Sequence, residues 1–255
     1  MPTPDLVKAE LRLTGRITSA SNATFLGSIG KTQVVYKPIA GEKPLWDFPE
    51  GSLAHREVAS YLISQTLGWD VVPHTWLRDG PLGEGMVQLW KEPDPEQSPV
   101  DLLPEHQVSQ NGWKHVLKGQ DESGQIIVLI HEDTPELRRM AVFDAIVNNA
   151  DRKGNHILAM PHGHRYGVDH GLTFHHEHKL RTVLWGWWGE SLSAEEMAGI
   201  KRVNQALSGE LGQRLEGLLS AEEIAALARR CQQISMAGQF PAPRGQMPAV
   251  PWPLF

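Results

Sequence analysis

The sequence predicts a two-lobed α+β fold, with a smaller amino-terminal lobe over residues 1–90 and a mostly helical lobe over residues 91–255. Three observations support this prediction. The first ninety residues contain short β-type runs around one helix, the following stretch to about residue 125 is polar and interrupted by prolines, and the last third has helical capping signals. A chain of 255 residues is long enough for one large domain or two modest lobes.

The predicted amino-terminal lobe consists of three β-type runs and one helix. The strands are expected at 33–37, 71–72 and 86–90, the helix at 53–67, and a turn at 78–83. Pro38 ends the first run because it cannot donate to a strand ladder. Gly68 follows the last apolar position of the helix, where glycine commonly ends a helix.

The second lobe is predicted to begin with a break and to continue as helices around a hairpin. The expected order is a proline-rich boundary or insertion at 91–125, a helix at 134–149, short strands at 156–160 and 165–168, helices in the last third, and an irregular tail from residue 239. Thr134 suits a helix cap, with Pro135 at the first helical position. Ser193 and Ser220 each precede a glutamate by three residues, which is the capping-box spacing.

Composition excludes several classes of protein. Hydrophobic residues make up 40% of the chain and charged residues 21%, which is typical of a folded globular protein. A net charge of −6 argues against general nucleic-acid binding. The single cysteine, Cys231, cannot form an internal disulfide. There is no apolar run of membrane-spanning length and no secretory leader pattern, so we expect a cytoplasmic protein without stable membrane insertion.

Three polar residues around the predicted hairpin could carry chemistry. Asp151 follows a helix, Asn155 lies four residues later, and Asp169 ends the second strand of the hairpin. Phosphoryl transfer needs this set, because one carboxylate accepts a hydroxyl proton while an amide oxygen and a second carboxylate bind Mg²⁺. Each residue alone could instead be an ordinary turn residue. The ordered trio favours the chemical interpretation.

A lysine and a glutamate in the first lobe could complete such a site. Lys37 lies on a predicted strand, and Glu57 lies twenty residues later on the predicted helix. Kinases use a strand lysine for the α/β-phosphates and a helix glutamate to orient it. The alternative is a solvated lysine and an exposed glutamate, since both residue types are mostly found at the surface.

Two further segments could contact a nucleotide. The residues Ser21, Asn22, Ala23 and Thr24 precede the lysine strand and could form a turn over phosphates, although they are not a glycine-rich loop. The residues Gln88, Leu89 and Trp90 end the first lobe, where a hinge that contacts adenine would fall.

Taken together, these residues resemble the phosphatidylinositol 3/4-kinase-like branch of the protein-kinase-like fold, which includes the HipA-like serine/threonine kinases. The resemblance spans roughly residues 20–175 and is greatest to small bacterial members. It rests on Val35-Tyr36-Lys37-Pro38, Arg56-Glu57, Asn149-Ala150-Asp151-Arg152-Lys153-Gly154-Asn155 and Val168-Asp169-His170-Gly171.

The resemblance implies a role for each site residue. Lys37 would bind phosphate and Glu57 would orient it, Asp151 would be the catalytic aspartate, and Asn155 and Asp169 would hold Mg²⁺. Lys153 stands where the family often has histidine, and a cation there would neutralise the transferred phosphoryl group. The implied reaction is transfer of the ATP γ-phosphoryl group to a hydroxyl of a protein serine or threonine, or of a small molecule.

Two alternatives remain open from the sequence. The chain could be a nucleotide-binding pseudokinase or regulatory protein. It could instead be a metal-dependent hydrolase built on the histidine cluster His162, His164, His170, His175, His176 and His178. No H-E-x-x-H motif occurs, and adjacent residues on an extended chain point to opposite faces, so the spacing disfavours a single metal ion.

Overall fold

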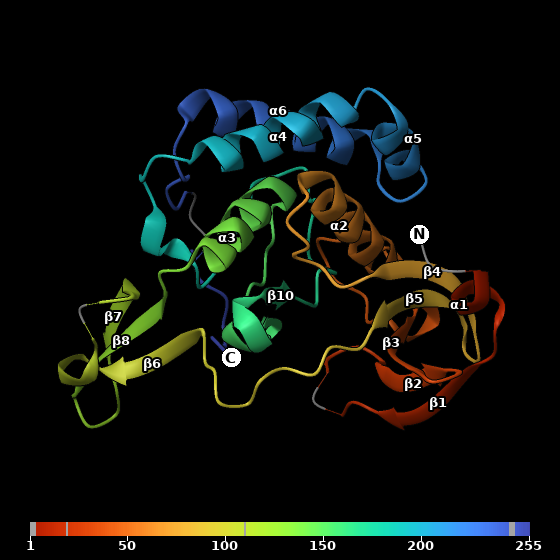
Figure 1. Cartoon of the computed structure of the whole chain (residues 1–255), viewed down its shortest axis with the longest axis horizontal. Coiled ribbons are helices and arrows are strands. Elements are labelled where there is room, and N and C mark those ends of the chain that lie inside the picture. Colours follow the sequence, from red (N-terminus) through yellow and green to blue (C-terminus); the bar gives the residue numbers. More distant parts are fainter. Residues whose placement is uncertain (1–3, 19, 110, 245–247) are drawn as a thin grey trace.

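The computed structural model of the chain describes residues 4–255 except 19, 110 and 245–247 (Figure 1). These residues form a mixed α/β structure with three antiparallel sheets and six α-helices. The strands are β1 (Leu11–Arg16), β2 (Phe25–Ile29), β3 (Thr32–Pro38), β4 (Thr75–Gly80), β5 (Gly83–Leu89), β6 (Val100–Pro104), β7 (Trp113–Gln120), β8 (Ile126–Glu132), β9 (Ile157–Ala159) and β10 (Arg165–Gly167). The α-helices are α1 (Pro4–Lys8), α2 (Leu53–Leu67), α3 (Pro135–Val147), α4 (Ala194–Ala206), α5 (Glu210–Glu216) and α6 (Ala221–Ala237).

The amino-terminal sheet has five strands in the order β1-β2-β3-β5-β4. The predicted strands at 33–37 and 86–90 are therefore confirmed as β3 and β5, which pair with Lys37 opposite Met86. The turn predicted at 78–83 is shorter than expected, because β4 continues to Gly80 and β5 begins at Gly83.

The prediction of a strand at 71–72 was wrong. Val71 and Val72 are buried, but their backbones bond outside any strand ladder: the carbonyl of Val71 accepts from Gly167 N–H, and Val72 N–H donates to Ser64 Oγ. The strand begins after Pro73, at Thr75. A short apolar pair thus marks burial here and not strand pairing, an ambiguity that short apolar runs always carry.

Helix α2 spans the predicted residues and connects the five-stranded sheet to the helices. Gly68 ends it in a left-handed conformation, with φ of 71°. The Glu42 carboxylate caps its other end by accepting from the N–H groups of Leu53 and Ala54. Its side chains pack both against β5 and into the main core with α3, α4 and α6, so it is buried on several faces.

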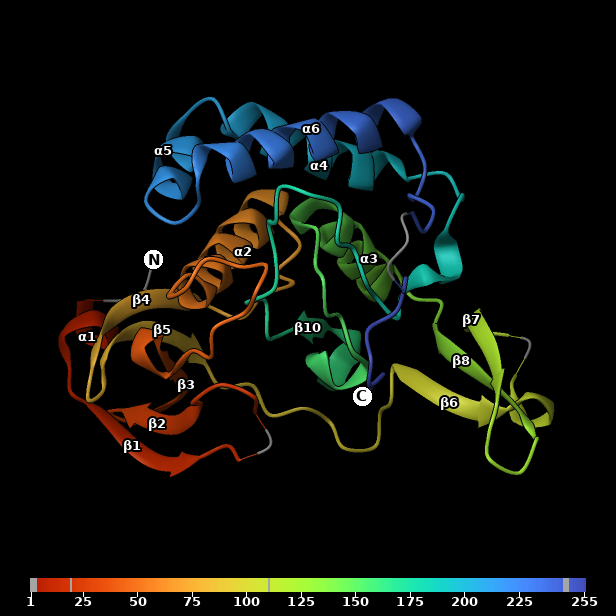
Figure 2. The ribbon, with the colours of Figure 1, turned by 180° about the vertical axis from the view of Figure 1, so that it is seen from behind.

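The polar stretch after residue 90 is an extended linker followed by a separate sheet. Figures 1 and 2 show the linker leading from β5 to a three-stranded sheet at the opposite end of the molecule from β1–β5. Its strand order is β6-β8-β7, so part of the predicted proline-rich boundary is regular β structure. The lobe boundary at residue 90 remains a prediction. Helix α2 lies before that boundary, yet it packs both with Met86 of β5 and with the helices that follow residue 90.

The remaining elements agree closely with those expected from the sequence. Helix α3 begins after Thr134, whose hydroxyl accepts from Leu137 N–H, and both predicted capping boxes are present at α4 and α6. The strands β9 and β10 form the predicted hairpin. Beyond Ala237, the described residues of the tail form neither helix nor extended strand, as predicted. Helices α4 and α6 form a layer across α2 and α3 (Figure 2).

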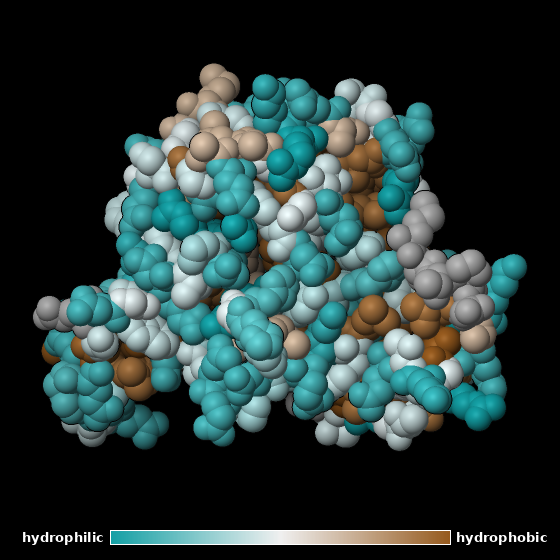
Figure 3. Space-filling view, in the orientation of Figure 1, coloured by the Kyte–Doolittle hydropathy of each residue, from teal (hydrophilic) through white to brown (hydrophobic). Residues whose placement is uncertain are grey.

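None of the described helices combines the length and apolar character that crossing a bilayer requires. On the face shown in Figure 3, hydrophilic residues predominate, and apolar residues gather over the five-stranded sheet and near α5.

A buried histidine joins the three-stranded sheet to the body. The ring of His131 lies 4.2 Å from that of Trp187, its Nε2 accepts from Gly186 N–H, and its Nδ1 donates to the Glu132 carbonyl. This pairing requires a neutral imidazole, and burial lowers the pKa of His131 to about 4.

Acidification is therefore expected to destabilise the fold through His131. The unfolded chain binds a proton at an ordinary histidine pKa of about 6.5, whereas the folded chain resists protonation until about pH 4. The free energy of unfolding should fall as the pH is lowered between these two values. Urea denaturation at several pH values would measure this, and His131→Gln should show a smaller fall. His106 is exposed. If His106→Gln reduced the fall in the free energy of unfolding as much as His131→Gln does, the effect could not be assigned to His131.

Candidate active site

A lysine ammonium holds three segments of the chain together at the centre of the candidate site. Lys37 Nζ, from β3, lies 2.6 Å from Glu57 Oε1 of α2 and 2.7 Å from Asp169 Oδ1, just after β10. The second oxygen of Glu57 accepts from the backbone N–H of His170 at 2.9 Å. The predicted pair of Lys37 and Glu57 is thus formed, and it is bonded to the segment that carries Asp169.

The charges of this cluster stabilise one another. Burial alone would lower the pKa of the Lys37 ammonium, but the carboxylates of Asp169 and Glu57 outweigh it and raise that pKa above its ordinary value. The Lys37 ammonium lowers the pKa of Asp169 well below its usual range. Lys37 is therefore a cation and Asp169 an anion at neutral pH, as phosphate and metal binding require.

Asp151 and Lys153 lie together on the loop that follows α3. Lys153 Nζ is 3.4 Å from Asp151 Oδ2. Burial raises the pKa of Asp151; the Lys153 cation opposes this, and the nearby Asp169 carboxylate adds to it. A carboxylate with a raised pKa is a better proton acceptor than an ordinary aspartate.

The hairpin brings the two predicted metal ligands to the same place. Val168 N–H donates to the His156 carbonyl at 3.0 Å, so Asn155 and Asp169 flank paired residues. His156 Nε2 is 3.5 Å from Asp169 Oδ2, while its Nδ1 donates to the Asp151 carbonyl. Burial lowers the pKa of His156 to about 4, which leaves it neutral beside Asp169.

These groups border a large cavity between the sheet and the hairpin. It has a volume of about 710 Å³, which is within the range of small-molecule sites. Most of the predicted site residues line it, namely Ser21, Asn22, Thr24, Lys37, Gln88, Leu89, Trp90, Asp151, Lys153, Asn155 and Asp169. Ala23 and Glu57 border an adjoining cavity of about 210 Å³, which shares Lys37, Asp151 and Asp169.

The predicted hinge residues line the cavity but already use their donors. Leu89 N–H donates to the His74 carbonyl at 2.9 Å, and Trp90 N–H donates to the Gln33 carbonyl at 3.0 Å. The side-chain amide of Gln88 donates to Thr75 Oγ1. These N–H groups are therefore not available to a ligand at 88–90.

Sequence reasoning missed a buried network beneath the site. Arg152 is fully buried, and its guanidinium binds both carboxylate oxygens of Asp144 on α3. It also donates to the carbonyls of His156 and Val168 and to Nε2 of His170. This one side chain fixes both the loop that carries Asp151 and the segment that carries Asp169. Only its position beside Asp151 could have pointed to it.

The histidine cluster does not gather at one point. His170 is buried against Arg152, His164 bonds to the Asp70 carbonyl, and His175 stacks on His176. His162 and His178 are exposed. Within the described part of the chain, no group of three or more His, Cys, Asp or Glu residues is placed to hold a metal ion.

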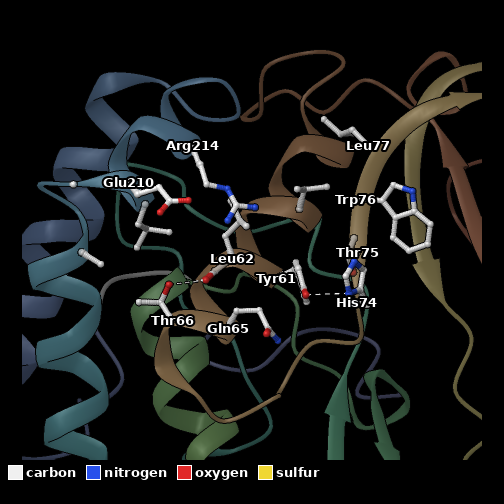
Figure 4. A pocket seen from close by; sticks show the side chains of 14 residues that line it. Tyr61, Leu62, Gln65, Thr66, His74, Thr75, Trp76, Leu77, Glu210 and Arg214 are labelled. Atoms are coloured by element: carbon white, nitrogen blue, oxygen red, sulfur yellow. Dashed lines mark hydrogen bonds between the residues drawn. The ribbon is translucent and has the colours of Figure 1, made fainter. Parts of the chain in front are cut away.

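A second cavity, of about 560 Å³, lies between α2, β4 and α5. Figure 4 shows Arg214 of α5 reaching toward Leu62 of α2, and Tyr61 hydrogen-bonded to His74. None of the predicted site residues lines this cavity. The cavity that holds Lys37 and Asp169 is therefore the candidate active site.

Comparison with known proteins gives one extensive sequence match. No family model matches the sequence. "Protein Rv2133c" of Mycobacterium tuberculosis (strain ATCC 25618 / H37Rv) is 49% identical over 263 residues, covering 98% of this chain and 94% of that protein. The crystal structure of the Helicobacter pylori proinflammatory kinase CtkA has a TM-score of 0.48 and 12% identity, covering 94% of this chain and 95% of that chain.

Proposed function

This chain belongs to the same family as the mycobacterial protein Rv2133c, and we propose that it is an ATP- and Mg²⁺-dependent kinase. The acceptor is a hydroxyl, either of a protein serine or threonine or of a small molecule. The observation that carries the proposal is the Lys37 ammonium bonded to both Glu57 and Asp169 on one wall of the cavity, with Asp151 on the same cavity. A phosphotransferase of the phosphatidylinositol 3/4-kinase-like type, with two lobes, needs these groups at one point.

Each residue of the cluster has a definite task in this reaction. Lys37, held by Glu57, binds the phosphates by charge. Asp151 accepts the proton of the attacking hydroxyl. At the same time the hydroxyl oxygen forms a bond to the γ-phosphorus, and the bond between that phosphorus and the leaving oxygen of ADP breaks. Lys153, next to Asp151, balances the charge of the transferred group. The products are a phosphate ester and ADP.

Asn155 and Asp169 fit a magnesium ion by their chemistry. Both line the cavity and are exposed, and together they present amide and carboxylate oxygens, the donors that Mg²⁺ prefers. The lowered pKa of Asp169 keeps its carboxylate ionised. Bound Mg²⁺ would offset the negative charge of the phosphates. Few protein ligands are expected, because Mg²⁺ usually keeps several waters and phosphate oxygens.

The first test removes the lysine charge. We expect Lys37→Met to weaken Mg·ATP binding and to slow phosphoryl transfer by about 10²-fold or more, the usual cost of losing one group aimed at transition-state charge. Calorimetric titration would measure binding, and transfer of labelled γ-phosphate to the protein itself or to a substrate panel would measure turnover.

Lys31→Met is the matched control, because Lys31 is exposed in the turn between β2 and β3 of the same sheet. It should bind Mg·ATP as the unaltered protein does. Failure of the unaltered protein to bind Mg·ATP would overturn the proposal. Binding without turnover on any acceptor would indicate a pseudokinase.

A further inference from the structure

The segment 248–255 is attached to the body of the protein at two separate places. The Ala249 carbonyl accepts from Thr182 N–H at 3.1 Å and from the indole N–H of Trp185 at 2.8 Å. Further on, the Leu254 carbonyl accepts from Gly154 N–H at 2.8 Å. Ala249, Val250 and Leu254 also pack against the main core. The segment therefore has a fixed path although it contains no regular structure.

Phe255 lies against the loop that carries the candidate catalytic residues. A Cβ placed on Gly154 would come within 2.3 Å of Cε1 of the Phe255 ring, so this contact needs glycine at position 154. Gly154 is between Lys153 and Asn155, both of which line the cavity. The segment 248–255 therefore packs closely against the loop that carries Lys153 and Asn155.

The same ring forms part of the cavity wall. Pro253 and Phe255 both line the cavity of about 710 Å³, together with the apolar side chains of Ile17 just after β1, Val35 of β3 and Leu158 of β9. Phe255 remains 43% exposed, so it has apolar surface to offer to a ligand. Trp252, three residues earlier, is 87% exposed and does not line the cavity.

We propose that the segment 248–255 is part of the nucleotide site and that Phe255 contacts the nucleoside part of a bound nucleotide. This inference rests on the proposed function. The Lys37 ammonium suits the phosphates and the Asp169 carboxylate suits the Mg²⁺ that accompanies them, whereas the apolar groups and Phe255 suit a base and sugar. An aromatic ring stacks well on a nucleobase, because every base has a flat π face.

Binding of two ligands separates this role from a merely structural one. Mg·ADP carries the nucleoside, and magnesium tripolyphosphate carries the phosphates alone. We expect Phe255→Ala to raise the Kd for Mg·ADP about tenfold, as a loss of about 1.4 kcal/mol implies, and to leave the Kd for tripolyphosphate unchanged. Trp252→Ala, the matched control, should change neither value.

Several results would overturn the inference. An unchanged Kd for Mg·ADP in Phe255→Ala would show that Phe255 does not contact the nucleoside. An equal loss of affinity for both ligands would show the same. Tighter Mg·ADP binding would show that the segment obstructs the site. Phe255→Leu keeps an apolar side chain beside Gly154 without an aromatic face, and it should still weaken Mg·ADP binding if Phe255→Ala fails to fold. No binding of Mg·ADP by the unaltered protein would instead overturn the proposed function, and this inference with it.

Discussion

Asp151→Asn is expected to reduce phosphoryl transfer by about 10³-fold, within the range of about 10²–10⁴ that a positioned general base contributes. The substitution keeps the size and shape of the side chain but removes its ability to accept a proton. Burial raises the pKa of Asp151, so the group lost is a better base than an ordinary aspartate. Binding of Mg·ADP should persist, because Lys37 and Asp169 are untouched.

The measurement is transfer of labelled γ-phosphate, with calorimetric titration of Mg·ADP on the same sample. Asp79→Asn is the matched control, since Asp79 is exposed at the end of β4 and lines neither cavity that borders Asp151. It should retain full turnover. If Asp151→Asn transferred phosphate as fast as the unaltered protein, Asp151 would not be the base.

Arg152→Ala is expected to destabilise the fold by about 3–5 kcal/mol, the cost of breaking a buried ion pair by removing one partner. Asp144 would remain fully buried without its guanidinium, and the carbonyls of His156 and Val168 would each lose the hydrogen bond that Arg152 donates. Denaturation by urea, followed by far-ultraviolet circular dichroism, would measure the change in the free energy of unfolding.

Arg139→Ala is the comparison for Arg152→Ala. Arg139 forms an ion pair with Glu195 that is partly exposed, and such pairs contribute about 0–1 kcal/mol. The double variant Arg152→Met with Asp144→Leu should recover part of the lost stability, because no buried charge is left unpaired. If Arg152→Ala lowered the free energy of unfolding by less than about 1 kcal/mol, the buried network would not be what holds the loop that carries Asp151.

Most of the helices could be predicted from local signals. Thr134, Ser193 and Ser220 each cap a helix in the structure as their sequence spacing indicated. Gly68 ends α2 in the left-handed conformation that glycine favours. These signals act within a few residues, so tertiary contacts seldom override them. The short strands were harder, because two apolar residues such as Val71 and Val72 fit a core as well as a ladder.

The residues of the candidate site were predicted in part. Its residues came from the pattern of Lys37, Asp151, Asn155 and Asp169, and the structure brings these residues to one cavity. Their roles remain predictions until turnover is measured. The burial of Arg152 could not be recognised, because a buried arginine and an exposed one look the same in a sequence. The contact of Phe255 with Gly154 is equally invisible, since about a hundred residues separate the two.

The amino-acid sequence alone was sufficient for the helix caps at Thr134, Ser193 and Ser220, the hairpin and the kinds of side chain available for chemistry, because each depends on neighbouring residues. The tertiary structure alone decided that Lys37 bonds to Asp169 across 132 residues, that Asp144 neutralises Arg152, and that the tail borders the cavity. Such contacts depend on burial and charge balance in the folded chain, where an ion pair far apart in sequence can offset the cost of removing charges from water.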